Sequence, residues 1–334
     1  MKTRLSMVAL LVVGTAVALP VRESGAQPVT EATVQAHADA ATKAAGADLK
    51  PLLELCKPAP AERPRGNDHA LEALINKPAP PPGRAFDNLY YVGAAWVSAW
   101  AINTPEGVIL IDALNTGKEA AQLIEDGMRK VGLDPARIKY IVVTHGHGDH
   151  YGGAAYLAGK YKAHIVMSDL DWKMMETKLE FDTPLWDRPP QRDVAVKDGD
   201  TVRLGGTTVT LYLTPGHTLG TISPVFDVKA NGQSHRVVEW GGTGFNFGAD
   251  FGRLDSYIAA TKRMRELARQ QNIDVLISNH SGFDEAPAKL DKLRQAPGGP
   301  NPFVLGVPAV ERSLTVMNEC AQAQRDRFKM MGLK

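Results

Sequence analysis

The sequence predicts an α/β protein, and three observations support this fold class. From Phe86 onward, short apolar or alternating segments typical of strands are separated by segments with helical periodicity. Turn-forming residues such as Thr104-Pro105-Glu106-Gly107 divide these segments. The polar residues of greatest chemical interest follow predicted strands, where a rigid sheet presents functional loops. With 334 residues, of which 44% are apolar, the chain can bury a sizeable core.

The predicted elements alternate along the chain, and we detect no internal repeat. Strands are expected at 89–92, 97–103, 108–112, 138–143, 164–167, 209–213 and 275–277, and around Val194, Val202, Ile222 and Val237. Helices are expected at 117–131, 154–161, 169–177, 254–270 and 307–328, the longest of which have apolar residues at helical spacing. The segment 178–192 is expected to be a loop. The sequence leaves open whether Trp172, Phe181 and Trp186 line a lid or belong to the core.

The first 26 residues have the three-part pattern of a secretory signal peptide. Lys2 and Arg4 precede the apolar stretch 5–19, and Ser24-Gly25-Ala26 offers small residues for cleavage. A membrane anchor is the alternative, but the stretch is shorter than the roughly 20 residues that span a bilayer. We therefore expect an exported, periplasmic protein without stable membrane insertion after cleavage. Residues 27–85 are expected to form an N-terminal extension, and residues 86–334 the main domain.

Charge and cysteine content restrict the partners and the covalent structure. The net charge is +1 and there is no basic run, which argues against nucleic acid or an anionic membrane surface as a partner. We expect a monomer that acts on a small molecule. Cys56 and Cys320 are the two cysteines. They could form a disulfide in an exported protein or remain buried free thiols, and the sequence leaves both open.

One short segment contains most of the candidate metal ligands. Three histidines and a carboxylate fall within six residues of the run Thr144-His145-Gly146-His147-Gly148-Asp149-His150-Tyr151-Gly152-Gly153. Zinc readily accepts imidazole nitrogen and carboxylate oxygen, and glycines let the backbone fold tightly around an ion. A polar loop with chance histidines is the alternative. The His-x-His-x-Asp-His order directly after an apolar strand argues against it.

Two further histidines follow predicted strands. His217 lies in a turn-rich loop after the strand at 209–213, and His280 follows the strand at 275–277. All the candidate ligands therefore come just after the C-terminal ends of strands. Six ligands are too many for one tetrahedral zinc, so two metal ions are the natural number.

These motifs resemble the metallo-β-lactamase superfamily, which has HxHxDH followed by two distant histidines. The resemblance covers roughly residues 86–280 and implies a four-layer αββα sandwich, with 86–334 as a catalytic domain. It also implies two Zn²⁺ ions. The first would be held by His145, His147 and His217, and the second by Asp149, His150 and His280.

The ligand types are most similar to those of the third subclass of class B β-lactamases, a di-zinc group. A histidine opens the motif, and no cysteine is among the expected ligands. The resemblance implies hydrolysis of the β-lactam ring by metal-bound hydroxide. The alternative is a di-metal hydrolase of the same fold that acts on lactones, thioesters or phosphoesters. The expected serines between the last two ligand loops are absent, which bears on the substrate and leaves the metal site unaffected.

Two aspartates near the motif have alternative roles. Asp149 is expected to be both a metal ligand and a catalytic residue, although a carboxylate there could also cap the following helix. Asp112 ends a strand and could orient a ligand histidine or simply form a turn. Because these two readings of Asp112 are equally supported, we do not include it in the predicted site.

Substrate contacts are expected from the segment Trp240-Gly241-Gly242-Thr243-Gly244-Phe245-Asn246. Thr243 or Asn246 could offer a hydroxyl or an amide to a substrate carboxylate. The glycines around them could equally serve only a turn.

Overall fold

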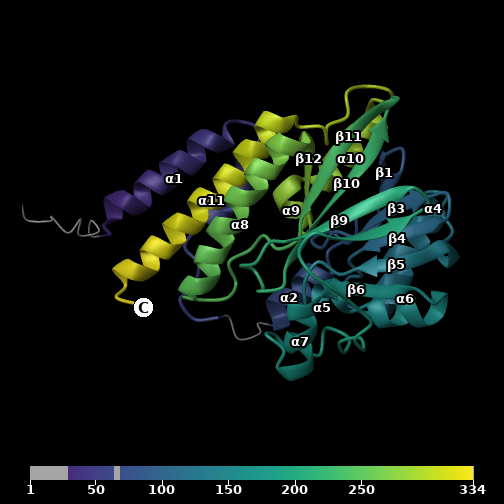
Figure 1. Ribbon diagram of the computed structural model, residues 1–334, viewed down its shortest axis with the longest axis horizontal. Coiled ribbons are helices and arrows are strands. Elements are labelled where there is room, and N and C mark those ends of the chain that lie inside the picture. The colour runs from purple at the N-terminus through teal and green to yellow at the C-terminus, as the bar shows by residue number, and fades with distance from the viewer. Residues whose placement is uncertain (1–28, 64–67, 334) are drawn as a thin grey trace, which may run out of the picture.

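The protein is a four-layer sandwich in which two sheets pack face to face and helices cover both outer faces, as predicted (Figure 1). The computed structural model describes residues 29–63 and 68–333. The predicted signal peptide, residues 1–26, lies outside the described residues.

The first sheet has seven strands in the described part of the chain, in the order β1 to β7. The strands from β1 to β4 pair antiparallel, and those from β4 to β7 pair parallel. They are β1 (Gly83–Phe86), β2 (Leu89–Tyr91), β3 (Trp100–Thr104), β4 (Gly107–Ile111), β5 (Ile138–Val142), β6 (His164–Ser168) and β7 (Val194–Val196).

The second sheet has five strands among the described residues, in the order β12-β11-β10-β9-β8. All neighbours pair antiparallel except β11 and β12, which are parallel. The strands are β8 (Asp200–Leu204), β9 (Thr207–Leu213), β10 (Ile222–Ala230), β11 (Gln233–Trp240) and β12 (Ile273–Ser278).

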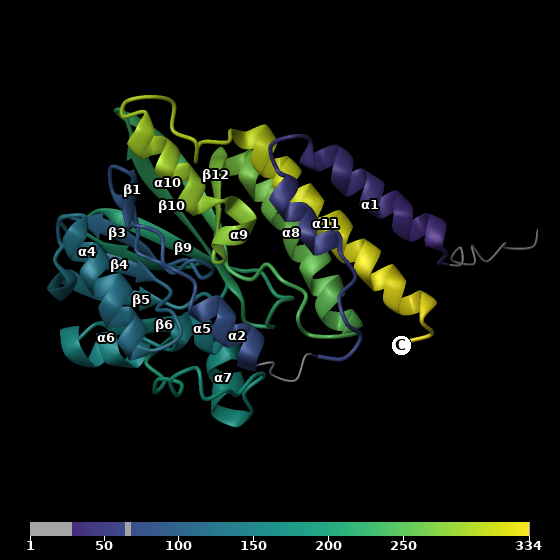
Figure 2. The same cartoon turned by 180° about the vertical axis from the view of Figure 1, so that it is seen from behind.

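Three long helices lie side by side on the outer face of the second sheet (Figures 1 and 2). They are α1 (Glu31–Ala45), α8 (Phe251–Gln271) and α11 (Val307–Met330). Their apolar residues share one cluster with Val225, Val238 and Leu276 of the sheet. The helices predicted at 254–270 and 307–328 are thus confirmed, each slightly longer than expected.

The N-terminal extension packs on this helical layer. After α1 come the 3-10 helix η1 (Lys50–Cys56) and the helix α2 (Asp68–Ile75). A disulfide joins Cys56 to Cys320 of α11, which resolves the alternative that the sequence left open. An ion pair between Asp48, just before η1, and Arg312 makes a further link to α11.

Shorter helices cover the outer face of the first sheet. They are α3 (Gly117–Glu119), η2 (Ala120–Glu125), α4 (Asp126–Lys130), η3 (Pro135–Arg137), α6 (Ala154–Tyr161) and α7 (Asp169–Thr177). The helix predicted at 117–131 is present, with a π-helical segment at its centre. Trp172 of α7 is fully buried in this layer, so it belongs to the core.

The strand predicted at 97–103 is wrong at its start, because β3 begins at Trp100. Residues before it form a turn in which the Ala94 amide donates to the Val97 carbonyl, and the Ser98 amide donates to the Asn279 carbonyl. The backbone therefore leaves the β2–β3 ladder to contact the loop after β12.

The loops at one edge of the two sheets are joined by backbone hydrogen bonds. The Ile222 amide of β10 donates to the carbonyl of Thr144, which follows β5 in the other sheet, at 2.9 Å. Two short helices lie at this edge, namely α5 (Gly148–Tyr151) and α9 (Ser281–Asp284), and α10 (Ala286–Gln295) follows α9 and contacts β1. Apolar side chains from both sheets fill the space between the two sheets. This rigid core holds the loops after β5, β9 and β12 in fixed positions.

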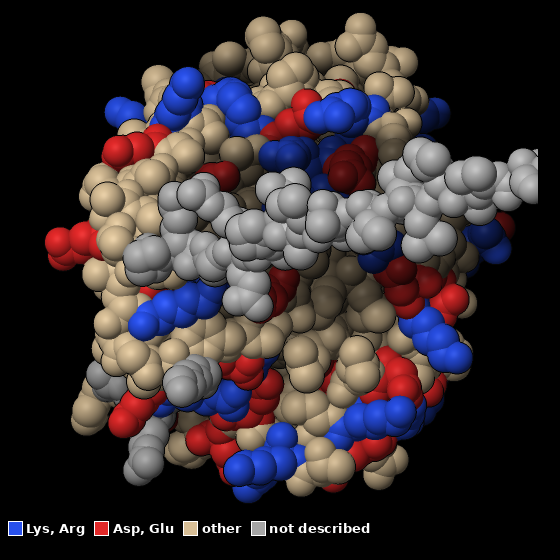
Figure 3. Space-filling view, turned by 60° about the vertical axis from the view of Figure 1, so that its left-hand side comes forward, with Lys and Arg blue, Asp and Glu red and all other residues tan. Residues whose placement is uncertain are grey.

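Among the described residues, no helix is long and apolar enough to cross a membrane. On the face shown in Figure 3, acidic and basic side chains of the described residues are interspersed. This distribution agrees with the near-neutral net charge of +1.

Candidate active site

The loop after β5 and the short helix α5 that follows it carry four of the predicted ligands, His145 and His147 in the loop and Asp149 and His150 in the helix. The chain leaves β5 at Val142, and His147 has extended backbone angles at the N-terminus of α5. Gly148 is needed here because a Cβ at this position would lie 2.4 Å from the Trp186 ring. The sequence thus forces a close turn that directs His145 and His147 toward the same point.

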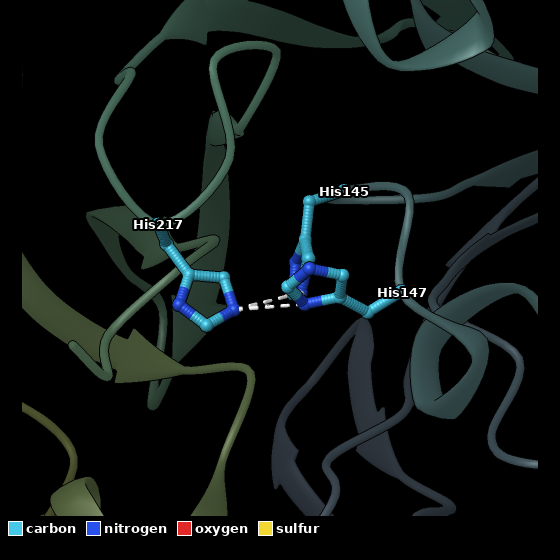
Figure 4. Close-up of side chains that lie close together, drawn as sticks. All are labelled: His145, His147 and His217. Atoms are coloured by element: carbon cyan, nitrogen blue, oxygen red, sulfur yellow. Dashed lines mark hydrogen bonds between the residues drawn. The ribbon is translucent and has the colours of Figure 1, made fainter. Parts of the chain in front are cut away.

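His145, His147 and His217 form the first ligand group (Figure 4). His145 Nε2 lies 3.0 Å from His147 Nδ1, and His217 Nε2 lies 3.1 Å from each of these atoms. Ligand atoms at about 2.0–2.1 Å from a tetrahedral zinc ion are roughly 3.4 Å apart. The three nitrogens therefore converge nearly as a metal ion requires.

In each ring of this group, the nitrogen that faces away from the other two rings has a partner outside the group. Nδ1 of His145 donates to the Gly241 carbonyl at 2.8 Å, and Nδ1 of His217 to the Gly244 carbonyl at 2.7 Å. Nε2 of His147 lies 3.1 Å from Glu180 Oε2. With these outer nitrogens protonated, three lone pairs point at one another. Such an arrangement is repulsive unless a cation lies between them, so the donor set fits a metal ion.

Asp149, His150 and His280 form the second group. Asp149 Oδ2 lies 3.4 Å from His150 Nε2 and 3.8 Å from His280 Nε2. The fully buried His150 Nε2 has no hydrogen-bond partner among the described residues. A buried nitrogen without a partner costs free energy, which a bound cation would remove. This group therefore also fits a metal ion, and His145 adjoins it through Asp149 and His150.

Asp112 contacts the second group on its buried side, where it orients His150. Its Oδ2 accepts from His150 Nδ1 at 2.7 Å, and Oδ1 accepts from the Thr144 amide at 2.8 Å. Nδ1 of His280 donates to the Trp96 carbonyl at 3.0 Å. The orienting role that the sequence left undecided for Asp112 is therefore the one that its contacts support.

The two groups differ in their electrostatics. Burial lowers the pKa values of His145 and His217 well below the usual range, and neighbouring histidines lower them further. Burial also disfavours the charged form of His150, but Asp149 and Asp112 nevertheless raise its pKa to about 10. His145 and His217 are thus held in the neutral form, whereas the second group contains the Asp149 carboxylate and lies against that of Asp112, both of which attract positive charge.

A cavity of about 840 Å³ opens above both groups. Its lining includes the ligands His147, Asp149, His217 and His280, together with Phe181 and Trp186 of the predicted 178–192 loop. Leu71 and Leu74 of α2 add an apolar wall from the N-terminal extension. A small molecule in this cavity would therefore meet the metal ligands on one side and apolar surface on the other.

The two predicted substrate contacts lie in different places. Asn246 lines the cavity, and its buried Oδ1 has no hydrogen-bond partner among the described residues. Thr243 is fully buried, with its hydroxyl 3.0 Å from Ser278 Oγ, and it does not line the cavity. The structure gives no support to the predicted substrate contact of Thr243, because its side chain points into the protein and links the loop after β11 to the end of β12.

Sequence reasoning missed three charged residues that support the ligand loops. Asp171 accepts from the Gly146 amide at 2.8 Å and from the Thr218 hydroxyl at 2.7 Å, so it ties the first ligand loop to the second. Glu180 contacts His147, and Arg253 pairs with Glu180. No local pattern signals these roles, because each contact joins residues far apart in the sequence. The remaining histidines, His37, His69, His164 and His235, are not members of either group.

A family model described as the metallo-beta-lactamase superfamily matches residues 95–229. This range includes the HxHxDH loop and His217. The chain carries a metallo-beta-lactamase superfamily domain.

Solved structures extend the likeness of this metallo-beta-lactamase domain over most of the chain. BJP-1, a subclass B3 metallo-beta-lactamase of Bradyrhizobium japonicum, is 29% identical with a TM-score of 0.63, and the match covers 78% of this chain and 97% of that one. Native FEZ-1 metallo-beta-lactamase from Legionella gormanii is 25% identical with a TM-score of 0.63, and the match covers 76% of this chain and 96% of FEZ-1.

Curated relatives of the domain carry a different name. A hydroxyacylglutathione hydrolase of Rhodopseudomonas palustris strain BisB5 is 36% identical over 128 residues, which is 38% of each chain. One from Acidiphilium cryptum is 33% identical over 90 residues, covering 27% of this chain and 31% of the relative. These matches span well under half of the relatives' length.

Proposed function

We propose that this protein is an exported di-zinc hydrolase that opens the β-lactam ring of antibiotics. The observation that carries the proposal is the convergence of two three-residue ligand groups, from three loops, at the floor of one cavity. Residues 1–26 serve as the signal peptide, and the mature protein acts in the periplasm on a small-molecule substrate.

The ligands divide between two ions as their contacts suggest. One ion is held by His145, His147 and His217, and the other by Asp149, His150 and His280. When bound, zinc makes water a competent nucleophile near neutral pH and polarises a carbonyl oxygen. Asp112 and the Gly241 and Gly244 carbonyls orient the imidazoles, so that the inner nitrogens face the ions.

The cavity supplies the substrate contacts. The Asn246 amide is the polar group that we assign to the substrate, since its Oδ1 lacks a protein partner in the described structure. Phe181, Trp186 and the α2 leucines Leu71 and Leu74 exclude water and contact apolar substituents. Without the expected serines, recognition of a substrate carboxylate is weak, so we expect a high KM.

β-Lactams are the preferred substrate class because the match to BJP-1 covers 97% of that subclass B3 enzyme and both groups lack cysteine. Thioesters are the second candidate. They are favoured by the relatives named hydroxyacylglutathione hydrolase, although those matches span only 38% of the first such relative.

The test is a comparison of substrates on one zinc-loaded preparation of the mature protein. A penicillin, a cephalosporin, a carbapenem and an S-acylglutathione are incubated in parallel, with and without EDTA. We expect EDTA-sensitive β-lactam opening that serine-directed inhibitors leave unchanged, because no serine forms an acyl-enzyme. Thioester cleavage with all three β-lactams intact would contradict the β-lactamase assignment and support the second candidate.

Export has its own test. The full-length chain is expressed in a Gram-negative host, and the periplasmic fraction is examined by N-terminal sequencing. A periplasmic product that starts at Gln27 is expected. A full-length product in the cytoplasm would contradict export without affecting the assignment of the hydrolase.

A further inference from the structure

An ion pair between Glu180 and Arg253 lies against the first ligand group. Glu180 Oε2 is 3.1 Å from His147 Nε2, and Glu180 Oε1 accepts from Arg253 Nη1 at 2.8 Å. Nε of the same arginine donates to the Gly216 carbonyl at 2.8 Å, one residue before His217. The pair thus contacts one ligand of the first group directly and reaches a second ligand through its backbone.

These contacts connect four separate segments. His147 follows β5, Gly216 follows β9, Glu180 lies in the loop after α7, and Arg253 lies in the first turn of α8. The side chains of Glu180 and Arg253 are 13% and 4% exposed, so their attraction is only weakly screened by solvent. The pair therefore adds a link between two ligand loops that Asp171 also joins.

Glu180 is held in place from several sides. The Arg253 guanidinium stacks on the Phe247 ring, at 4.5 Å from its centroid. Arg63 of the N-terminal extension lies 3.8 Å from Glu180 Oε2 and donates to the Glu180 carbonyl at 3.3 Å. The guanidinium groups of Arg63 and Arg253 thus hold the Glu180 carboxylate against His147.

A carboxylate in this position determines which nitrogen of His147 carries its proton. When Nε2 donates to Glu180, Nδ1 is left with the lone pair that faces His145 and His217. Hydrogen bonding of this kind fixes the tautomer and orientation of a ligand imidazole and raises its basicity. In the second group, Asp112 has the same relation to His150.

We propose that Glu180 and Arg253 are a positioning pair that sets the zinc affinity of the first ligand group and leaves the second group unchanged. This inference rests on the proposed metal centre. In the described part of the structure, neither Glu180 nor Arg253 contacts a ligand of the second group. The effect on zinc affinity is therefore confined to the ion of the first group. Arg253 acts through Glu180 and Gly216, and Glu180 acts through His147.

The experiment measures the zinc affinity of each group separately, by competition with a chromophoric chelator. The first group is isolated in a His280→Ala background, and the second in a His217→Ala background. Glu180→Ala, Glu180→Gln and Arg253→Lys are made in both. The matched control is Glu176→Gln, because Glu176 is an exposed carboxylate nearby in the sequence that pairs with Arg192 at 3.3 Å.

We expect Glu180→Ala to weaken zinc binding at the first group by roughly 10- to 100-fold, with no change at the second. Glu180→Gln should recover part of the loss, because its carbonyl still accepts from Nε2–H. Arg253→Lys should give a smaller loss, since a lysine cannot contact Glu180 and Gly216 in the same forked geometry. Glu176→Gln should match the unmodified backgrounds.

Thermal unfolding of the zinc-free proteins separates positioning from general stability. A Glu180→Ala variant with unchanged first-group affinity and a lowered Tm would overturn the proposal and leave a structural ion pair. Equal weakening at both groups would also overturn it. If the unsubstituted protein fails to bind two zinc ions, the proposed metal centre itself falls. If the unsubstituted protein binds two zinc ions and Glu180→Ala leaves the affinity of the first group unchanged, only the proposed positioning role is overturned and the metal centre stands.

Discussion

The two ligand groups are built differently, although they share one cavity. The first consists of three imidazoles whose facing nitrogens lie 3.0–3.1 Å apart, and two of its outer partners are backbone carbonyls. The second contains a carboxylate and has longer separations of 3.4 and 3.8 Å. A second carboxylate, that of Asp112, supports it from the buried side.

This difference indicates that the two groups depend on different interactions. Backbone carbonyls hold His145 and His217 of the first group, so Glu180 behind His147 is the outer partner of this group that a side-chain substitution removes. The second group depends on charge, because Asp149 and Asp112 must offset the burial of His150. We therefore expect loss of a ligand to be severe in either group, and loss of the outer carboxylate, Glu180 or Asp112, to weaken only the group that it contacts.

The largest expected effect is that of removing a ligand from the first group. His217→Ala leaves two protein ligands for that ion, and we expect kcat/KM to fall by at least about 1,000-fold, or about 4 kcal/mol of transition-state stabilisation. Steady-state kinetics on a zinc-replete, folded variant checks this. The control is His164→Ala, which removes an exposed histidine that pairs with Asp193. Most of the activity surviving in His217→Ala would show that His217 is not a ligand.

The next effect concerns the outer partner of the second group. In Asp112→Asn, an amide NH₂ must face either the Thr144 amide or His150 Nδ1, both of which are donors to Asp112. We expect zinc affinity at the second group to fall by roughly 10- to 100-fold, while the first group is unchanged. Chelator competition measures both affinities. Asp193→Asn is the matched control, because its pair with His164 is exposed. Equal zinc affinities at the second group in Asp112→Asn and Asp193→Asn would contradict the proposal that Asp112 orients His150.

A smaller effect is expected at the substrate contact. Asn246→Ala removes a polar group from the cavity without touching either ligand group, so KM should rise about tenfold, as loss of one hydrogen bond of about 1.4 kcal/mol would cause. The zinc content should stay the same. A variant whose zinc content falls, or whose KM is unchanged, would show that Asn246 does not contact substrate.

The smallest effect on activity is expected far from both groups. Replacing Cys56 and Cys320 by alanine removes a cross-link between residues 264 positions apart in the sequence. The free energy of unfolding should fall by about 2–5 kcal/mol, whereas kcat/KM and zinc content should change little. Denaturant unfolding with and without reductant checks the first expectation. Loss of zinc in the folded double variant would show that the extension also shapes the metal centre.

Local patterns were sufficient to predict most of this arrangement. The ligands of both groups follow β5, β9 and β12, and an apolar strand followed by histidines is visible without any knowledge of tertiary structure. The sandwich came from the resemblance and is confirmed. The strand start at Val97 was wrong because the pairing of Ser98 with Asn279 is a long-range contact.

The outer partners could not be predicted in the same way. Glu180 reaches His147 from a loop of irregular sequence, and Arg253 looks like any polar residue in the first turn of a helix. Thr243 and Asn246 lie three residues apart in one glycine-rich loop, yet only Asn246 faces the cavity. The direction of a side chain in such a loop depends on the packing around it, which sequence periodicity does not encode.

Metal stoichiometry tests the central claim most directly. The mature protein, the His217→Ala variant and the His280→Ala variant are equilibrated with excess zinc, freed of unbound metal and analysed by inductively coupled plasma mass spectrometry. Two separate three-ligand groups predict close to two zinc ions per chain in the unsubstituted protein and close to one in each variant. One ion or fewer in the unsubstituted protein under saturating zinc would contradict the di-zinc centre.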